Sequence, residues 1–241
     1  MPRRIASSRR EFLHRVAGLG LSFSAAGILI TGCTQTKSSG STRNNQALNA
    51  DQALQELMEG NKRYVVSKPT RPDQTAEYRT EVAKGQHPFA VIVGCSDSRV
   101  PPEIVFDQGL GDLFVIRVAG NVVDDEALGS IEYAAEEFKL PLVVVLGHER
   151  CGAVKATIDA LEKGGEVPGH IKSLVEAIKP SVEKAKEQTG DLLDNAVRAN
   201  VQRVVAQLKT TEPILSELVS TSKIRIVGAR YDLDSGTVEL I

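Results

Sequence analysis

Short apolar runs alternate along this chain with longer segments whose apolar residues have helical spacing. The runs that predict buried strands are 88–94, 113–118, 142–146 and 223–228. The run at 142–146 contains no polar residue, which is typical of a strand covered on both faces. A turn at 234–236 then precedes residues 237–241, which we expect to form a final edge strand.

The helical spacing falls between these runs. Helices are predicted over 51–65, 125–138, 153–163, 171–188 and 192–208. Asp51 is the expected N-cap of the first helix, and the proline-containing stretch 67–75 is expected to be extended. Strands that alternate with helices predict an α/β fold. We expect a mostly parallel central sheet of four strands plus a C-terminal edge strand, with helices on both faces and an N-terminal helical arm.

The first 32 residues differ in character from the rest. They carry five Arg and one Glu, and residues 16–32 contain no charge. A basic start followed by a modest apolar stretch is typical of an export signal. Ser8–Leu13 (SRREFL) resembles the twin-arginine signal, and Ile30–Cys33 (ITGC) resembles a lipobox, which predicts lipid on Cys33. An uncleaved helix that anchors the chain is the alternative.

These patterns divide the chain into an export signal over 1–32, a flexible polar tether over 33–50 and one domain over 51–241. We therefore expect an exported protein. It would lie in the periplasm, in the thylakoid lumen or at the outer face of a membrane. Contact with the membrane is expected only through the signal or through lipid on Cys33.

Composition narrows the class of partner. A net charge of −2 gives no basic excess for nucleic acid, and an aromatic content of 4% without Trp argues against a stacking platform for single strands. The presence of only three Cys excludes a disulfide scaffold. We therefore expect a small-molecule substrate and no nucleic acid.

Two predicted strands end in residues that bind metal. Cys95 directly follows the first strand, and His148 and Cys151 follow the third. Ligands bind beyond the carboxyl ends of the strands in open parallel sheets, so these three side chains can converge. Two thiolates and one imidazole suit Zn²⁺, and three protein ligands leave a fourth position open, as in catalytic zinc sites. Two cysteines buried as small hydrophobic residues are the alternative.

The two motifs together, CSDSR at 95–99 and GHERCG at 147–152, resemble those of the β-class carbonic anhydrases. The resemblance extends over about 51–241 and includes FDQGLGDLFVIRVAGN at 106–121. It implies one Zn²⁺ per chain and reversible hydration of CO₂ to bicarbonate and a proton by hydroxide on zinc. It also implies a homodimer or a higher homo-oligomer, with the site built across the interface.

The resemblance also implies roles for individual residues. Asp97 would orient the attacking hydroxide, and Arg99 would hold Asp97 off the metal through a bidentate contact. Gln86 and the backbone N–H of Gly152 would donate to the substrate oxygen. The residues expected to line the small CO₂ pocket are Phe114, Ala119 and Tyr133, and Gln86 or Tyr133 could reach the partner's zinc.

The sequence also bears on the regulatory subtype, on the proton shuttle and on alternative functions. One family subtype has an inhibitory bicarbonate site that uses a Trp where this chain has Ile92, so we expect the permanently open subtype. His87 and His170 are candidate proton shuttles. Hydrolysis of CS₂ or carbonyl sulfide on the same fold and a non-catalytic, zinc-stapled module are the alternative functions.

Overall fold

The computed structural model describes residues 48–164 and 167–241. The predicted export signal, most of the tether and Cys33 therefore lie outside the described residues. The strands are β1 (Ala90–Gly94), β2 (Leu113–Arg117), β3 (Leu142–His148), β4 (Arg225–Tyr231) and β5 (Val238–Leu240). The helices are α1 (Ala50–Val65), α2 (Ala76–Val82), α3 (Pro102–Val105), α4 (Asp125–Phe138), α5 (Gly152–Lys163), α6 (Ile171–Ala185), α7 (Leu192–Thr210) and α8 (Ile214–Ser220), with a 3₁₀ turn, η2, at Ala119–Asn121.

The strands form one sheet in the order β2-β1-β3-β4-β5. The first four are parallel to one another, and β5 pairs with β4 in the antiparallel direction. The predicted fold class is therefore confirmed, including the C-terminal edge strand. Within the described part of the chain, no helix has the length and apolar character needed to span a membrane.

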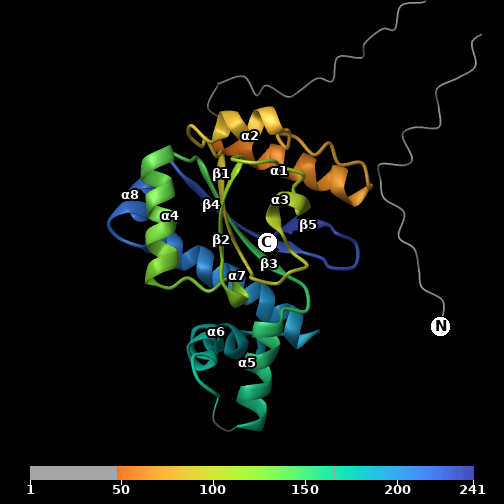
Figure 1. Cartoon of the computed structure of the whole chain (residues 1–241). Coiled ribbons are helices and arrows are strands. Elements are labelled where there is room, and N and C mark those ends of the chain that lie inside the picture. Colours follow the sequence, from red (N-terminus) through yellow and green to blue (C-terminus); the bar gives the residue numbers. More distant parts are fainter. Residues whose placement is uncertain (1–47, 165–166) are drawn as a thin grey trace, which may run out of the picture. The chain divides into compact units, whose positions relative to one another are not determined.

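Helices cover both faces of the sheet, as Figure 1 shows with the sheet seen nearly edge-on. On one face, alternate strand residues such as Val91 and Val143 pack into a core with α4, α7 and α8. On the other face, Ile92 and Val144 pack against α1 and the α3 segment. This alternation follows from the period of two in a strand, and burial on both faces explains why β1 and β3 are continuously apolar.

A third apolar cluster lies among α5, α6 and α7 and includes Cys95 and Cys151. Helix α7 also approaches the sheet closely: a Cβ on Gly147 would stand 2.4 Å from Val201 Cγ2. Glycine at this position, one residue before the end of β3, therefore lets the helix lie against the strand next to His148. The residues at the carboxyl ends of β1 and β3 are thus packed against helices α5, α6 and α7.

Several local predictions need correction. Asn49, and not Asp51, caps α1, because its side chain accepts from Gln52 N and Gln52 reaches back to Asn49 N in a capping box. Asp51 instead lies in the first turn, where its charge complements the helix dipole. Strand β3 continues to His148, two residues beyond the predicted end. The short helices α2, α3 and α8 were not predicted.

Candidate metal centre

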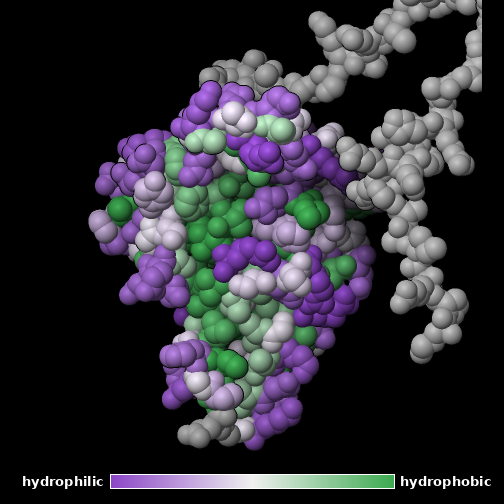
Figure 2. Space-filling view, viewed as in Figure 1, coloured by the Kyte–Doolittle hydropathy of each residue, from purple (hydrophilic) through white to green (hydrophobic). Residues whose placement is uncertain are grey.

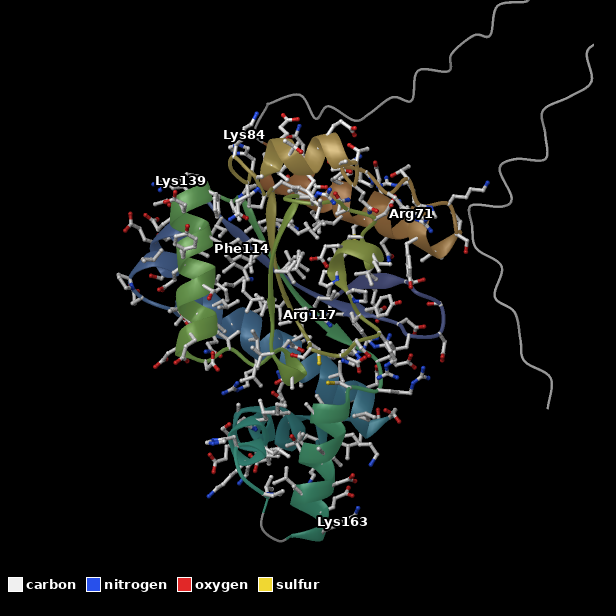
Figure 3. The ribbon with its side chains drawn as sticks, viewed as in Figure 1. Arg71, Lys84, Phe114, Arg117, Lys139 and Lys163 are labelled. Carbon is white, nitrogen blue, oxygen red and sulfur yellow. The ribbon has the colours of Figure 1, made fainter. Side chains whose placement is uncertain are left out.

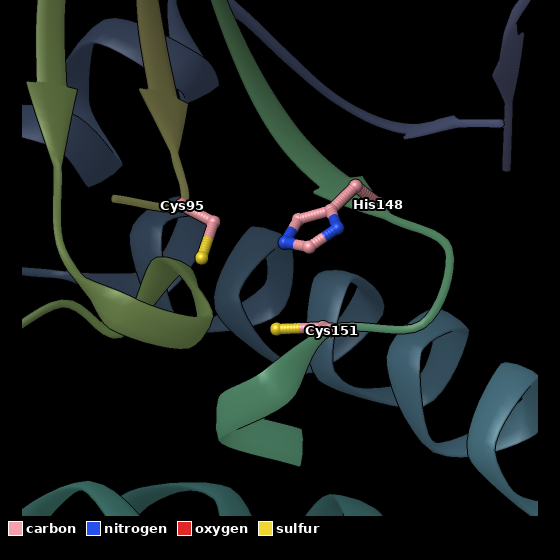
Figure 4. Close-up of side chains that lie close together, drawn as sticks. All are labelled: Cys95, His148 and Cys151. Carbon is pink, nitrogen blue, oxygen red and sulfur yellow. The ribbon is translucent and has the colours of Figure 1, made fainter. Parts of the chain in front are cut away.

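The topology brings three metal-binding side chains together. Strands β1 and β3 are parallel neighbours with Gly94 opposite Leu146, so Cys95 and His148 lie at the same edge of the sheet. Cys151 lies three residues after the end of β3 and is the N-cap residue of α5. Figure 4 shows the three side chains pointing toward one another. Their ligand atoms all lie within 4.8 Å of one another, and all three residues are buried.

His148 is oriented for a metal. Its ring is fully buried, and Nδ1 lies 2.9 Å from the backbone oxygen of Glu149, which can only accept a hydrogen bond. Nδ1 therefore carries the proton, and Nε2 presents its lone pair toward the two sulfurs. Nε2 is buried without a hydrogen-bond partner. A buried polar atom without a partner is costly, and a metal ion would satisfy it.

A hydrogen bond links the two cysteine side chains and shifts their pKa values in opposite directions. A hydrogen bond from the Cys151 thiol lowers the pKa of Cys95 to about 4, helped by His148 and by the Gly120 N–H and opposed by burial. The same contact and burial raise the pKa of Cys151. A second negative sulfur in this buried place needs a cation, and thiolate is the form that binds metal. The three residues therefore fit Zn²⁺ by their donor types, their spacing and their charge.

Asp97 lies beside this cluster and is held by Arg99. Arg99 Nε donates to Asp97 Oδ1 at 2.9 Å, and Arg99 Nη2 donates to Oδ2 at 2.7 Å. Oδ2 lies 3.8 Å from His148 Nε2. The Arg99 guanidinium, through these hydrogen bonds, holds the pKa of Asp97 well below its usual range. Asp97 is therefore a carboxylate at any pH near neutral, and it can only accept hydrogen bonds.

Arg117, at the end of β2, fixes the backbone that carries Cys95 and Asp97. Its Nε donates to Cys95 O at 2.9 Å, and its Nη2 donates to Asp97 O at 2.5 Å. Ser96 Oγ in turn donates to Arg117 O at 3.2 Å. The motif at 95–99 is thus held at its backbone by the neighbouring strand, which keeps Asp97 near the metal ligands.

The segment between His148 and Cys151 is also held. Arg150, in the left-handed region at φ 51°, makes two hydrogen bonds to the Asp234 carboxylate at 2.7 and 2.8 Å. Glu149 Oε2 accepts from Leu233 N at 3.2 Å. Glu149 and Arg150 thus connect the metal-binding loop to the turn between β4 and β5.

The substrate-binding candidates do not all lie near this chain's own cluster. Gly152 follows Cys151 directly, at the start of α5, and is exposed. Gln86 and His87 are exposed in the segment before β1. Phe114 stands three residues before Arg117 on β2, so roughly 10 Å of strand separates them. Figure 3 labels both, with Arg117 at the end near the sulfur atoms and Phe114 beside α4.

An aromatic cluster surrounds Phe114. Its ring centroid lies 6.3 Å from that of Tyr133 and 6.0 Å from that of Phe138, and the last two meet edge to face at 5.9 Å. Tyr133 is 54% exposed. Strand β2 is an edge of the sheet, and its apolar side chains are only half-buried. Figure 2 shows a continuous apolar band on this face of the molecule.

Comparisons with known proteins also indicate a carbonic anhydrase. The family model described as "Carbonic anhydrase" matches residues 90–238, from the start of β1 into β5. The "Carbonic anhydrase 2" of Mycobacterium tuberculosis is 44% identical over 188 residues, which cover 78% of this chain and 91% of that protein. The solved structure of the β-carbonic anhydrase CcaA covers 78% of this chain and 94% of its own, with a TM-score of 0.62 and 27% identity. That of a Coccomyxa β-carbonic anhydrase in complex with acetazolamide covers 78% and 86%, with a TM-score of 0.61 and 26% identity.

A parallel α/β sheet that presents a Cys-His-Cys zinc site at its carboxyl edge defines a zinc enzyme of the carbonic anhydrase type. The chain belongs to the β-class carbonic anhydrase family. It is a zinc-dependent enzyme that hydrates CO₂, with Cys95, His148 and Cys151 as the zinc site. The CO₂ hydration implied by the two sequence motifs is therefore confirmed.

Proposed function

We propose that this carbonic anhydrase works as an exported homo-oligomer in which Asp97 and Arg99 complete the catalytic centre. The observation that carries this proposal is the bidentate contact between Arg99 and Asp97 beside the three zinc ligands. The chemistry that bound zinc supplies is the acidification of a water molecule, whose pKa falls to about 7. The remaining tasks fall to side chains of the protein.

Asp97 is suited to orient the attacking oxygen. Its Oδ2 is the carboxylate oxygen nearest the ligand cluster, and one hydrogen bond from Arg99 leaves it a lone pair for another donor. In our proposal it accepts the remaining proton of the attacking oxygen, so that an oxygen lone pair faces the carbon of CO₂. Because its pKa is lowered, Asp97 keeps this acceptor role through the neutral range.

Arg99 has a second task in this proposal. A free carboxylate so close to the cluster could itself bind the metal and block the site. Arg99 makes a hydrogen bond to each oxygen of Asp97 and so holds the carboxylate in place beside the cluster. Ile92 stands inside β1 where the inhibitory bicarbonate site would need Trp. Both features support a form of the enzyme that stays open at neutral pH.

The substrate pocket needs a second copy of the chain. Gly152 N–H belongs to the first turn of α5 beside Cys151 and is a donor for the oxygen on which negative charge develops. Phe114 and Tyr133 lie back along β2 and on α4, with Gln86 before β1, and all are at least partly exposed. We propose that a partner chain packs on the apolar face at β2, which is formed by the half-buried side chains of β2 together with Tyr133 and Phe138. Gln86, Phe114 and Tyr133 of one chain would then serve the zinc of the other.

Stopped-flow CO₂ hydration tests the roles of Asp97 and Arg99. Arg99→Ala should lose most activity while keeping its zinc, because Asp97 is then free to turn to the metal. Arg79→Ala is the matched control, since Arg79 is an exposed arginine on α2. Equal activity in both variants would contradict the proposal. Parallel assays with CS₂ and carbonyl sulfide would show whether either is the better substrate.

Assembly can be tested independently. Tyr133→Glu places a charge on the apolar face at β2 and should shift the protein toward monomers in sedimentation. If the pocket is shared, activity should fall together with the fraction of dimer. Glu132→Gln, one residue away on α4, is a control that keeps the apolar face. Fully active monomers would contradict a site shared between chains.

The proposed export concerns residues 1–32, with 33–50 as the tether and 51–241 as the enzyme domain. The motifs SRREFL and ITGC support transport through the twin-arginine route and lipid on Cys33. Folding and zinc loading before export would protect the two ligand thiols from oxidation. Arg9→Lys with Arg10→Lys should leave precursor inside the cell, whereas Arg3→Lys with Arg4→Lys, a second arginine pair, should not. Normal export of the first variant would refute the route.

A further inference from the structure

We propose that Asn200, on α7, is a positioning residue for the zinc ligand Cys95 and acts through Gly120. The proposal rests on the zinc site alone and not on the proposed roles of Asp97 and Arg99. Asn200 does not touch the ligand cluster. Its effect would pass through a short chain of hydrogen bonds that crosses from the helical layer to the metal-binding sulfur.

The first link is the side chain of Asn200 itself. It is 1% exposed and lies where α6 and α7 pack together near the apolar cluster of Cys95 and Cys151. Its Nδ2 donates to Gly120 O at 2.8 Å, and its Oδ1 accepts from Ser181 Oγ at 3.2 Å. Ser181, on α6, is also 1% exposed. A buried amide must have its hydrogen bonds satisfied, and this one directs its donor to η2.

The second link is Gly120, the central residue of η2. Its N–H donates to Cys95 Sγ at 3.2 Å. Its backbone has φ 68° and ψ 21°, in the left-handed region, and a Cβ would stand 2.7 Å from Ile178 Cδ1 and 3.1 Å from Ala153 Cβ. Glycine is therefore required both by conformation and by space. Helices α5 and α6 confine this residue, and Asn200 fixes the orientation of its carbonyl group.

The hydrogen bond to sulfur has two consequences. It stabilises the negative charge on Cys95, and it holds the sulfur at one side of the cluster, toward His148 and Cys151. Asn200, Gly120 and Cys95, which this series of hydrogen bonds connects, are all buried. Water therefore cannot easily take the place of a lost partner. Groups of this kind around a metal site change metal affinity by about 10–100-fold when they are removed.

Zinc release measures this effect without reference to catalysis. We would load each variant with zinc, add an excess of a chromophoric chelator and follow the rate of transfer. Asn200→Ala should release zinc about 10–100-fold faster than the unmutated protein. Ser181→Ala should change the rate in the same direction but less, because the amide stays in place.

The matched control is Asn61→Ala. Asn61, on α1, is 2% exposed and donates to Val105 O at 3.1 Å and to Gly236 O at 2.9 Å. It is thus as buried and as well bonded to backbone as Asn200, but it is not linked to a zinc ligand. Its loss should destabilise the fold and leave the rate of zinc release unchanged. Equal acceleration in both Asn variants would overturn the proposal, because the effect would then be one of general stability.

A spectroscopic signature separates positioning from loosening. In the Co²⁺-substituted protein, losing the hydrogen bond to Cys95 raises the energy of the sulfur lone pairs. The sulfur-to-cobalt charge-transfer band should therefore move to lower energy in Asn200→Ala and stay in place in Asn61→Ala. An unmoved band in Asn200→Ala would overturn the proposal. If that variant does not fold, Ser181→Ala decides, and zinc release no faster than in Asn61→Ala would count against it.

Discussion

Replacing Asp107 by Asn should destabilise the enzyme strongly, although Asp107 lies outside the zinc site. Its carboxylate is 1% exposed. It accepts from Arg63 Nε at 2.6 Å, from both Thr70 N and Thr70 Oγ1 at 2.8 Å, and from Arg71 N at 2.8 Å. These contacts tie the segment between α1 and α2 to the core. An Asn amide would turn an NH₂ group toward several of these donors.

The magnitude follows from the loss of a buried, charged acceptor. Breaking a buried ion pair by removing one partner costs about 3–5 kcal/mol. Arg63 is 29% exposed and can turn toward water, so the lower end applies. We therefore expect the free energy of unfolding to fall by about 3 kcal/mol. With an m-value of about 2–3 kcal/mol per molar urea, the unfolding midpoint should drop by about 1–1.5 M.

The effect should depend on pH in a defined direction. Burial opposes the charge on Asp107, but hydrogen bonds from Arg63, Thr70 and Arg71 outweigh it and hold its pKa below the ordinary value. A group with a depressed pKa stabilises the folded state above its unfolded pKa, about 4 for Asp, and this contribution is lost as the pH falls further. The difference between the unmutated protein and Asp107→Asn should therefore be full at pH 7 and shrink below about pH 4.

Urea unfolding at fixed protein and zinc concentrations is the assay, because oligomerisation and metal binding both shift apparent stability. Asp159→Asn is the control. Asp159, on α5, pairs with Lys155 at 2.7 Å at the surface, and its loss should leave the midpoint unchanged. An unchanged midpoint in Asp107→Asn, or a difference that stays constant through pH 3, would refute the reasoning.

Two further predictions concern the zinc site. Cys151→Ser should lose most of its zinc by metal analysis and unfold more readily, because metal binding is linked to folding, and full zinc occupancy would exclude Cys151 as a ligand. The pH–rate profile should rise as one step with a pKa of about 7, without cooperative collapse below about pH 8 and without cooperative inhibition by bicarbonate, since Asp97 stays ionised and held by Arg99. A steep, cooperative loss of activity at neutral pH would mean that Asp97 closes the site.

The sequence was most informative where local patterns decide the structure. Strands β1 and β3 are buried and largely apolar, Cys95 directly follows β1, and His148 ends β3 three residues before Cys151. The rule for parallel sheets was therefore enough to bring these side chains together. The helices α2, α3 and α8 span at most seven residues, too few for a helical period to emerge.

Other contacts depend on residues far apart in the chain. Asn200 and Gly120 are 80 positions apart, and nothing in the local sequence of either indicates that they meet. Arg150 and Asp234 are 84 positions apart, and the local sequence of neither residue indicates their contact. For Asn200 the sequence offers one chemical indication. A polar Asn among the apolar positions of a helix needs a hydrogen-bond partner.

The assignment of Cys95, His148 and Cys151 as the catalytic zinc site is tested by CO₂ hydration followed while zinc is returned to the metal-free enzyme. Without metal we expect no activity above background. As zinc is returned, we expect a linear rise to one zinc per chain and no further gain, with no recovery in a Cys95→Ser variant. Activity in the fully metal-free protein, or saturation at another ratio of zinc to chain, would contradict a catalytic centre built by Cys95, His148 and Cys151.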